Sequence, residues 1–140
     1  MNRPIIQAVR EYIMEFPKLK DGCLLVDHLG GEPVEYTVEP VPCSPVYKKY
    51  VDGDCIKQFL FLFASREYYS ADVNQNIENL SFYEDFSEWI CDRNFNGILP
   101  DLGSERAALG IEILTGGYMP SADTNTARYQ IQLRLIYEEE

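Results

Sequence analysis

The end of the chain carries its clearest pattern of hydrophobic and polar positions. Over residues 126–137, every second position is hydrophobic, and arginines and glutamines fill most of the positions between them. The hydrophobic set is Ala127, Tyr129, Ile131, Leu133, Leu135 and Tyr137. Because successive side chains of a strand point to opposite faces of a sheet, this alternation predicts one long strand with a single buried face.

A second strand is predicted over residues 56–64, where both alternating sets of positions are hydrophobic. One set contains Phe59, Phe61 and Phe63, and the other contains Leu60 and Leu62. Such a pattern indicates a central strand that is covered on both faces. The dipeptide Asp52-Gly53 just before it is a strong hairpin signal, which predicts pairing with residues 46–51.

Two amphipathic helices are predicted, over residues 4–16 and 72–94. The first begins at Pro4, which suits a first helical turn, and ends before Pro17. The second repeats large hydrophobic residues at helical spacing, with acidic residues facing water. The hydrophobic repeat is Ile77, Leu80, Tyr83, Phe86 and Ile90, and the acidic residues are Glu78, Glu84, Asp85 and Glu88.

Shorter strands are predicted over residues 23–29, 34–38 and 109–114. Gly30-Gly31 separates the first two, and Gly116-Gly117 predicts a bulge or turn after the third. Prolines at positions 40, 42 and 45 predict an edge or a loop over residues 40–45. The polar residues 121–126 predict a further loop. The order helix, strands, helix, strands indicates an α+β fold.

Length and charge limit the classes of function. The chain has 140 residues, so we expect a single domain over residues 1–140. Its formal net charge of −11 disfavours nucleic-acid binding through a basic surface, and the only basic doublet is Lys48-Lys49. No segment has the pattern of a signal peptide or of a membrane span, so we expect a reducing intracellular environment.

The four cysteines, at positions 23, 43, 55 and 91, contain no C-x-x-C pair and give little support to a zinc site. Cys23, Cys55 and Cys91 lie within hydrophobic patterns, so we expect them to pack as small core residues.

The segment from residue 92 to residue 97 matches the first half of a calcium-binding loop. Asp92, Asn94 and Asn96 occupy ligand positions, and a glycine follows. The second half does not match, because Gly103 stands where a bidentate glutamate is required. We therefore expect no metal here and interpret the segment as a helix C-terminus closed by asparagine and glycine.

The sequence contains no convincing catalytic motif. His28 is the only histidine, and no G-x-S-x-G elbow accompanies it, so we interpret it as an exposed residue at a strand end. The acidic pairs Asp52/Asp54 and Glu84/Asp85 could serve as acid and base. They fall at a hairpin tip and on the polar side of a helix, which favours structural roles. We expect no catalytic residues and no cofactor.

Aromatic residues form the remaining cluster. Those of the second helix, from Phe82 to Trp89, are interpreted as core residues. Tyrosines beside the Asp52-Gly53 hairpin are better interface candidates, because a hairpin arm near its turn is not fully buried and tyrosine is favoured at interfaces. The predicted subunit interface consists of Tyr47, Tyr50, Asp52 and Asp54.

Several segments follow one another in a recognisable order after residue 54. They are Phe59-Leu60-Phe61, Asn79-Leu80-Ser81-Phe82-Tyr83-Glu84, Leu99-Pro100 and the final run from Thr126 through Leu133 to Tyr137. This succession resembles the tail-terminator (minor tail or tail-completion) proteins of long-tailed bacteriophages and prophages of Gram-positive bacteria. The resemblance covers most of the chain after the prolines and is looser over the first helix.

The resemblance implies an α+β fold in which two main helices pack on a mainly antiparallel sheet of about 4–5 strands. It also implies a homo-oligomeric ring, commonly a hexamer, at the head-proximal end of the tail. The ring ends tail-tube growth, contacts the major tail protein and the head-completion or connector proteins, and lets DNA pass through. The family has no catalytic residues, and its members work in the virion tail after assembly in the bacterial cytoplasm.

The residues themselves suggest how such a ring could assemble. A ring needs two different patches on each subunit. The hairpin near Tyr47 and residues 40–45 could supply one patch, and unpaired sheet edges could supply the other through strand addition. An acidic lumen would gain nothing from counterion release, so DNA could slide through without specific binding. The alternatives are a small acidic monomeric regulator or adaptor of the DNA-mimic type and a small enzyme or calcium-binding module.

Overall fold

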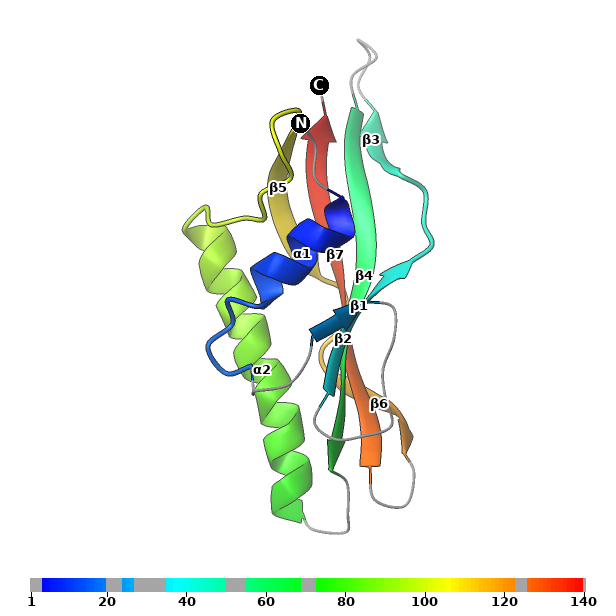
Figure 1. Ribbon diagram of the computed structural model, residues 1–140, viewed down its shortest axis with the longest axis vertical. Helices are drawn as coiled ribbons and strands as arrows, with labels where there is room; N and C mark the ends of the chain where they lie inside the picture. The colour runs from blue at the N-terminus through cyan, green and yellow to red at the C-terminus, as the bar shows by residue number, and fades with distance from the viewer. Residues whose placement is uncertain are drawn as a thin grey trace.

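The computed structural model describes residues 4–19, 24–26, 35–49, 55–68, 73–122 and 126–139. In these residues, one mainly antiparallel sheet carries two helices on the same face (Figure 1). The helices are α1 (Ile5–Ile13) and α2 (Val73–Phe95). The strands are β1 (Leu24–Val26), β2 (Glu35–Val41), β3 (Val46–Lys49), β4 (Cys55–Tyr68), β5 (Arg106–Ile113), β6 (Tyr118–Ala122) and β7 (Thr126–Glu139). The predicted α+β class is confirmed, although the described part of the chain forms a sheet of seven strands rather than four or five.

The two longest strands, β4 and β7, form the centre of the sheet. Each has 14 residues, and they pair along their whole length, from Ile56 opposite Glu138 to Tyr68 opposite Thr126. At about 3.3 Å per residue, this pair is about 45 Å long. The strand order is β1-β2-β4-β7-β5, with β3 beside the start of β4 and β6 beside the start of β7. Only β1 and β2 pair in parallel among these strands.

The core lies between the helices and one face of the sheet. All six hydrophobic residues of the β7 alternation are buried, so the prediction for this strand is confirmed. Above them, α1 contributes Val9 and Ile13, and α2 contributes Phe86 and Ile90. The limits predicted for α2 are also correct to within one residue at each end.

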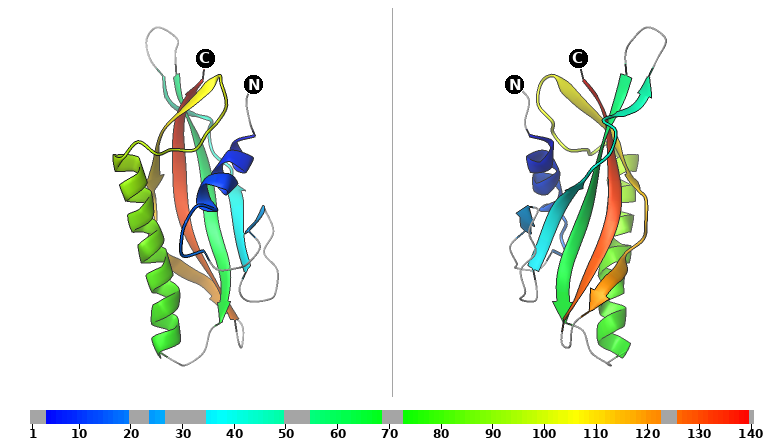
Figure 2. Two further views of the ribbon diagram at one scale, coloured as in Figure 1. Left: turned by 60° about the vertical axis from the view of Figure 1, so that its left-hand side comes forward. Right: turned by 90° about the vertical axis from the view of Figure 1, so that its right-hand side faces the viewer.

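The prediction that β4 is covered on both faces is wrong. Phe61 and Phe63 are buried under the helices, but Leu60 and Leu62 point to the opposite face and are only half-buried. The right-hand view of Figure 2 shows this uncovered face, with α2 behind the sheet. Leu60 lies opposite Arg134 of β7, and long polar side chains of this kind can screen a hydrophobic neighbour without a second layer.

The proline-rich segment starts later than predicted. Strand β2 continues through Pro40, which pairs with Phe61 of β4, and ends at Val41. Because β1 pairs no further than Val38, Pro40 lies on an edge where, among the described residues, no neighbour requires its missing N–H. The pairing of β3 with β4 confirms the predicted hairpin arms, while the predicted turn lies outside the described residues.

Several smaller predictions fail for identifiable reasons. The buried stripe of α2 runs through Asn79, Tyr83, Phe86 and Ile90, so Ile77 and Leu80 lie beside it and are exposed. Cys91 follows Ile90 and is turned to solvent, and Cys55 is half-buried. Strand β6 was not predicted, because Tyr-Met-Pro-Ser-Ala has no clear alternation. Cys23 lies outside the described residues.

A hydrogen-bonded contact fixes α2 to the centre of the sheet. The Tyr83 hydroxyl lies 2.6 Å from the Ser65 hydroxyl and donates to the Tyr129 carbonyl at 3.1 Å. Gly117, in the β5–β6 connection, packs against the same tyrosine so closely that an added Cβ would lie 2.4 Å from the Tyr83 Cβ. Burial raises the pKa of Tyr83 well above its usual range.

Candidate functional site

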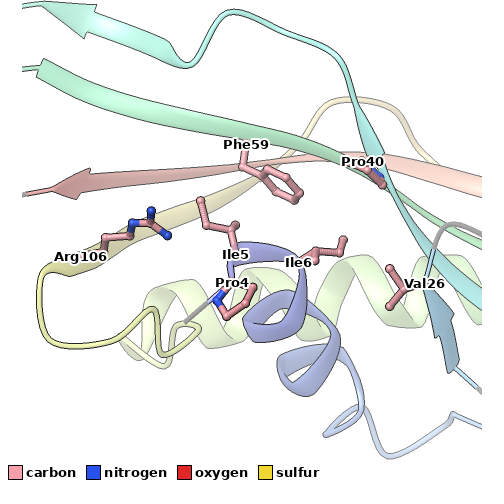
Figure 3. Close-up of a pocket in the computed structure, with 7 residues that line it drawn as sticks. All are labelled: Pro4, Ile5, Ile6, Val26, Pro40, Phe59 and Arg106. Carbon is pink, nitrogen blue, oxygen red and sulfur yellow. The ribbon is translucent and has the colours of Figure 1, made fainter. Parts of the chain in front are cut away.

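A groove opens where the N-terminal end of α1 meets the sheet (Figure 3). Its volume is about 480 Å³, within the range of pockets that bind small molecules or single large side chains. It is lined by Pro4, Ile5, Ile6, Val26, Pro40, Phe59 and Arg106. Six of these seven residues are hydrophobic, and Arg106 is the only charged one. The groove is therefore suited to holding a hydrophobic group beside an anion.

The wall formed by α1 is fixed by local sequence features. The Ala8 N–H donates to the Pro4 carbonyl at 3.1 Å and closes the first turn, where a proline needs no N–H partner. Arg10 then donates from Nε to the Leu24 carbonyl at 2.8 Å, which attaches α1 to β1. These bonds hold the half-buried Ile5 and Ile6 opposite the sheet.

Positive charge gathers at the Arg106 end of the groove. The Glu139 carboxylate accepts from Lys57 Nζ at 3.3 Å and from Arg106 Nε at 3.4 Å. The hydrogen bond from Lys57, helped by the charges of Lys57 and Arg106, lowers the pKa of Glu139. The Arg106 guanidinium also lies 6.0 Å from the centre of the Tyr137 ring. Two cations thus share one carboxylate among these side chains.

Of the four predicted interface residues, the structure describes one. Tyr47 is exposed on β3, and the Arg134 guanidinium lies 5.2 Å from the centre of its ring. All four residues of β3 are exposed, as expected for an edge strand that extends beyond both helices (Figure 1). Tyr50, Asp52 and Asp54 lie outside the described residues, so their role stays a prediction.

The three residues that resemble calcium ligands close the end of α2. Asn94 donates from Nδ2 to the Ile111 carbonyl at 2.6 Å and accepts from the Ile111 N–H at 3.0 Å. Asn96 donates to the Asp92 carbonyl at 2.9 Å. Gly97 has a φ of +72°, the left-handed conformation of a helix-ending glycine. The interpretation of this segment as a helix C-terminus is confirmed.

The same contact changes the expectation for the sheet edges. The Asn94 amide occupies both backbone hydrogen-bonding groups of Ile111 on the outer side of β5. A strand from another molecule cannot pair with those groups while the amide remains there. The predicted strand addition is therefore blocked at this point of β5.

The remaining candidates are the single histidine, the acidic pair Glu84/Asp85 and the aromatic residues of α2. His28 lies outside the described residues. Asp85 forms an ion pair with Lys18 at 2.7 Å, while the neighbouring Glu84 points to solvent. The aromatic residues of α2 from Phe82 to Trp89 pack in or against the core as predicted, with the Phe86 and Phe63 ring centres 4.7 Å apart.

The uncovered face of the sheet carries paired charges. Arg128 donates from both terminal nitrogens to the Glu39 carboxylate, at 2.9 and 3.2 Å. Arg134 donates to Glu112 at 2.9 Å. Gln130 accepts from Arg128 Nε at 2.8 Å. The polar set of the β7 alternation is thus used in a hydrogen bond within β7 and in ion pairs to β2 and β5.

Sequence reasoning missed Phe95, the last residue of α2. It is 91% exposed, far more than any other large hydrophobic residue in the described part of the chain. A signal for it exists, because continuing the helical spacing of Tyr83, Phe86 and Ile90 leads to positions 93, 94 and 97, which leaves Phe95 off the buried stripe.

Two findings limit the kinds of site. In the described ranges, no helix is long and hydrophobic enough to cross a membrane. The same residues contain no group of three or more histidine, cysteine or acidic side chains arranged to hold a metal ion.

No protein-family model matches this sequence, and no curated protein matches it either.

Proposed function

We propose that this chain is a tail-terminator protein of a long-tailed bacteriophage or prophage. Its subunits assemble as a ring at the head-proximal end of the tail, end tail-tube growth and join the tail to the head connector. The proposal starts from the order of segments that follows residue 54. It is supported most directly by one observation: all four residues of the edge strand β3 are exposed, and the strand extends beyond the helices.

An exposed edge strand supports assembly because its backbone can pair with another polypeptide. Strand addition gives affinity through main-chain hydrogen bonds, and neighbouring side chains such as Tyr47 give specificity. A closed ring needs one such patch and a different, complementary patch on each subunit. The other edge of the sheet is capped at Ile111, which favours one direction of assembly over random edge pairing.

The uncovered face supports passage of DNA without tight binding. Arg128 is already paired with Glu39 of β2, and Arg134 with Glu112 of β5. A DNA phosphate would have to displace that carboxylate before it could bind the arginine. With a net charge of −11, the chain offers little gain from the release of DNA counterions.

The decisive experiment uses tail tubes assembled from the major tail protein of the same phage or prophage. With the chain present, we expect tubes of limited length that carry a ring at one end in electron micrographs. Without it, the tubes should grow longer and vary more in length. Tubes whose length and ends do not change on addition of the chain would exclude the proposal. Salt-sensitive DNA binding by the isolated chain would contradict the proposed passage.

A small acidic regulator of the DNA-mimic type is the second candidate. It is supported by Glu78, Glu84 and Glu88, which are exposed on α2 and form no ion pair in the described part of the chain. A regulator of this kind should be a stable monomer that competes with DNA for a protein partner. Size-exclusion chromatography with light scattering, followed by such a competition assay, distinguishes it from a ring-forming subunit.

A further inference from the structure

Phe95 is the most unusual residue on the surface of this protein. At 91% exposure, nearly the whole phenyl ring is in contact with water. Burial of an apolar side chain of this size stabilises a protein, so an exposed Phe95 adds nothing to the stability of the isolated fold. An aromatic residue kept in this position is typical of an anchor that enters a pocket on a partner.

The end of α2 holds Phe95 in a fixed position. On one side, the amide of Asn94 is bonded to both backbone groups of Ile111. On the other side, Arg93 pairs with Glu15 at 3.1 Å, and its guanidinium lies 4.4 Å from the centre of the Trp89 ring. Because the backbone is fixed from both sides, binding through Phe95 would lose little conformational entropy.

The neighbours of Phe95 give the end of α2 a specific chemistry. Asp92, three residues earlier, and Cys91, four residues earlier, lie on the same side of the helix, and both are exposed. The Asp92 carboxylate forms no ion pair in the part of the chain that the structure describes. The tip of α2 therefore presents a hydrophobic ring next to a carboxylate.

The groove beside α1 has the complementary chemistry. It offers about 480 Å³ between hydrophobic side chains such as Ile5 and Phe59, with Arg106 at one end (Figure 3). Lys57 adds a second cation close to Arg106, and the two share the Glu139 carboxylate. A ring inserted among the hydrophobic side chains would bring a neighbouring carboxylate toward this positive end. The Phe95 of the same chain does not fill the groove, because it is exposed.

We propose that the groove of one subunit receives Phe95 of a second copy of this chain, with Asp92 of that copy facing Arg106. Each copy then carries one tip and one groove, so the contact is head-to-tail and can be repeated from subunit to subunit. This inference rests on the proposed function, since it specifies a contact between neighbouring subunits of the ring.

Sedimentation equilibrium of the full chain tests the hydrophobic half of the contact. The Phe95→Ala substitution should raise the dissociation constant of self-association at least about tenfold, because the ring that fills the groove is removed. Tyr68→Ala is the matched control, since Tyr68 is an exposed aromatic residue at the far end of β4, and it should leave association unchanged. Circular dichroism verifies that both variants remain folded.

A charge exchange tests the polar half. Asp92→Arg and Arg106→Glu should each weaken association, and the two changes combined in one chain should restore much of it, because the ion pair is rebuilt with reversed signs. A merely structural role for Arg106 would not produce this recovery. Equal association of wild type and Phe95→Ala, or absence of recovery in the combined variant, would overturn the inference.

The outcomes also separate this inference from the proposed function. Wild-type chain that stays monomeric up to about 1 mM, where even weak contacts are populated, would overturn the inference. Self-association that depends on Phe95, without any effect of the chain on tube length, would keep the inference and exclude the tail-terminator function. Rings that assemble on tubes equally well with Phe95→Ala would exclude the inference alone.

Discussion

The two faces of the β4–β7 pair are built from alternate residues of the same two strands, yet different forces hold them. On the covered face, side chains such as Phe63 and Leu133 are buried under the helices. On the uncovered face, ion pairs such as Arg128–Glu39, which reaches from β7 across β4 to β2, connect different strands. The difference teaches that burial under the helices stabilises the covered face, whereas ion pairs contribute most on the uncovered face. Substitutions on the two faces should therefore differ strongly in their effect on stability.

The largest effect is expected from Phe63→Ala on the covered face. Phe63 is fully buried, and its ring lies beside those of Tyr36, Phe82, Tyr83 and Phe86. Removing the ring leaves a cavity, so the free energy of unfolding should fall by about 3–5 kcal/mol in urea denaturation. The adjacent Leu62→Ala, on the uncovered face, should lose less than half as much. Equal losses for both variants would show that the faces do not differ.

The next effect concerns the position of α2 over the covered face. A methyl group at position 117 would lie 2.4 Å from the Tyr83 Cβ, so Gly117→Ala must displace the helix or the β5–β6 connection. We expect a loss of about 1–3 kcal/mol in the free energy of unfolding. Gly116→Ala is the matched control, because no atom lies within 4 Å of its added Cβ. A stable Gly117→Ala variant would mean that this contact is looser than described.

The buried hydroxyl of Tyr83, on the covered face, should make the free energy of unfolding depend on pH. Burial raises its pKa in the folded state, so the unfolded chain releases this proton first when the pH rises past about 10. The stabilisation that comes from keeping Tyr83 protonated is therefore fully present below about pH 10. Above that pH, the free energy of unfolding should fall.

Tyr83→Phe should reduce that fall, which denaturation curves at several alkaline pH values can measure. At neutral pH it should destabilise the fold by about 1–3 kcal/mol, because the buried Ser65 hydroxyl loses its partner. The same alkaline slope in wild type and variant would exclude Tyr83 as its source.

The smallest effect is expected on the uncovered face. Glu112, the partner of Arg134, has a side chain that is 45% exposed. Arg134→Ala should therefore change the free energy of unfolding by at most about 1 kcal/mol, and added salt should reduce the difference further. A loss comparable to that of Phe63→Ala would mean that the ion pairs hold the sheet together as strongly as the core does.

Sequence patterns predicted the covered face well and the uncovered face poorly. The strict alternation of β7 has one physical meaning, and the buried residues match it. The hydrophobic residues Leu60 and Leu62 allow two interpretations, since either a second layer or long polar neighbours can screen them from water. The sequence could not distinguish these cases, because the identity of the cross-strand neighbour depends on register.

The groove could not be predicted for a related reason. Its residues come from α1 and from four strands that are far apart along the chain, so no local spacing reveals them. Phe95 was overlooked because hydrophobic residues in helices are assumed to face the core, and only the phase of the buried stripe contradicts this. The function itself, as a tail terminator, stays a proposal that depends on assembly experiments.

The side chain of Asn94 has a consequence for solubility at high protein concentration. A bare β5 would offer an open row of peptide groups to any extended polypeptide, and stacking of that kind has no natural end. With both groups of Ile111 occupied, that border of the sheet is closed at this residue. We expect changes at Asn94 to appear first as turbidity rather than as loss of the folded state, because they open this point of the border to pairing with other molecules.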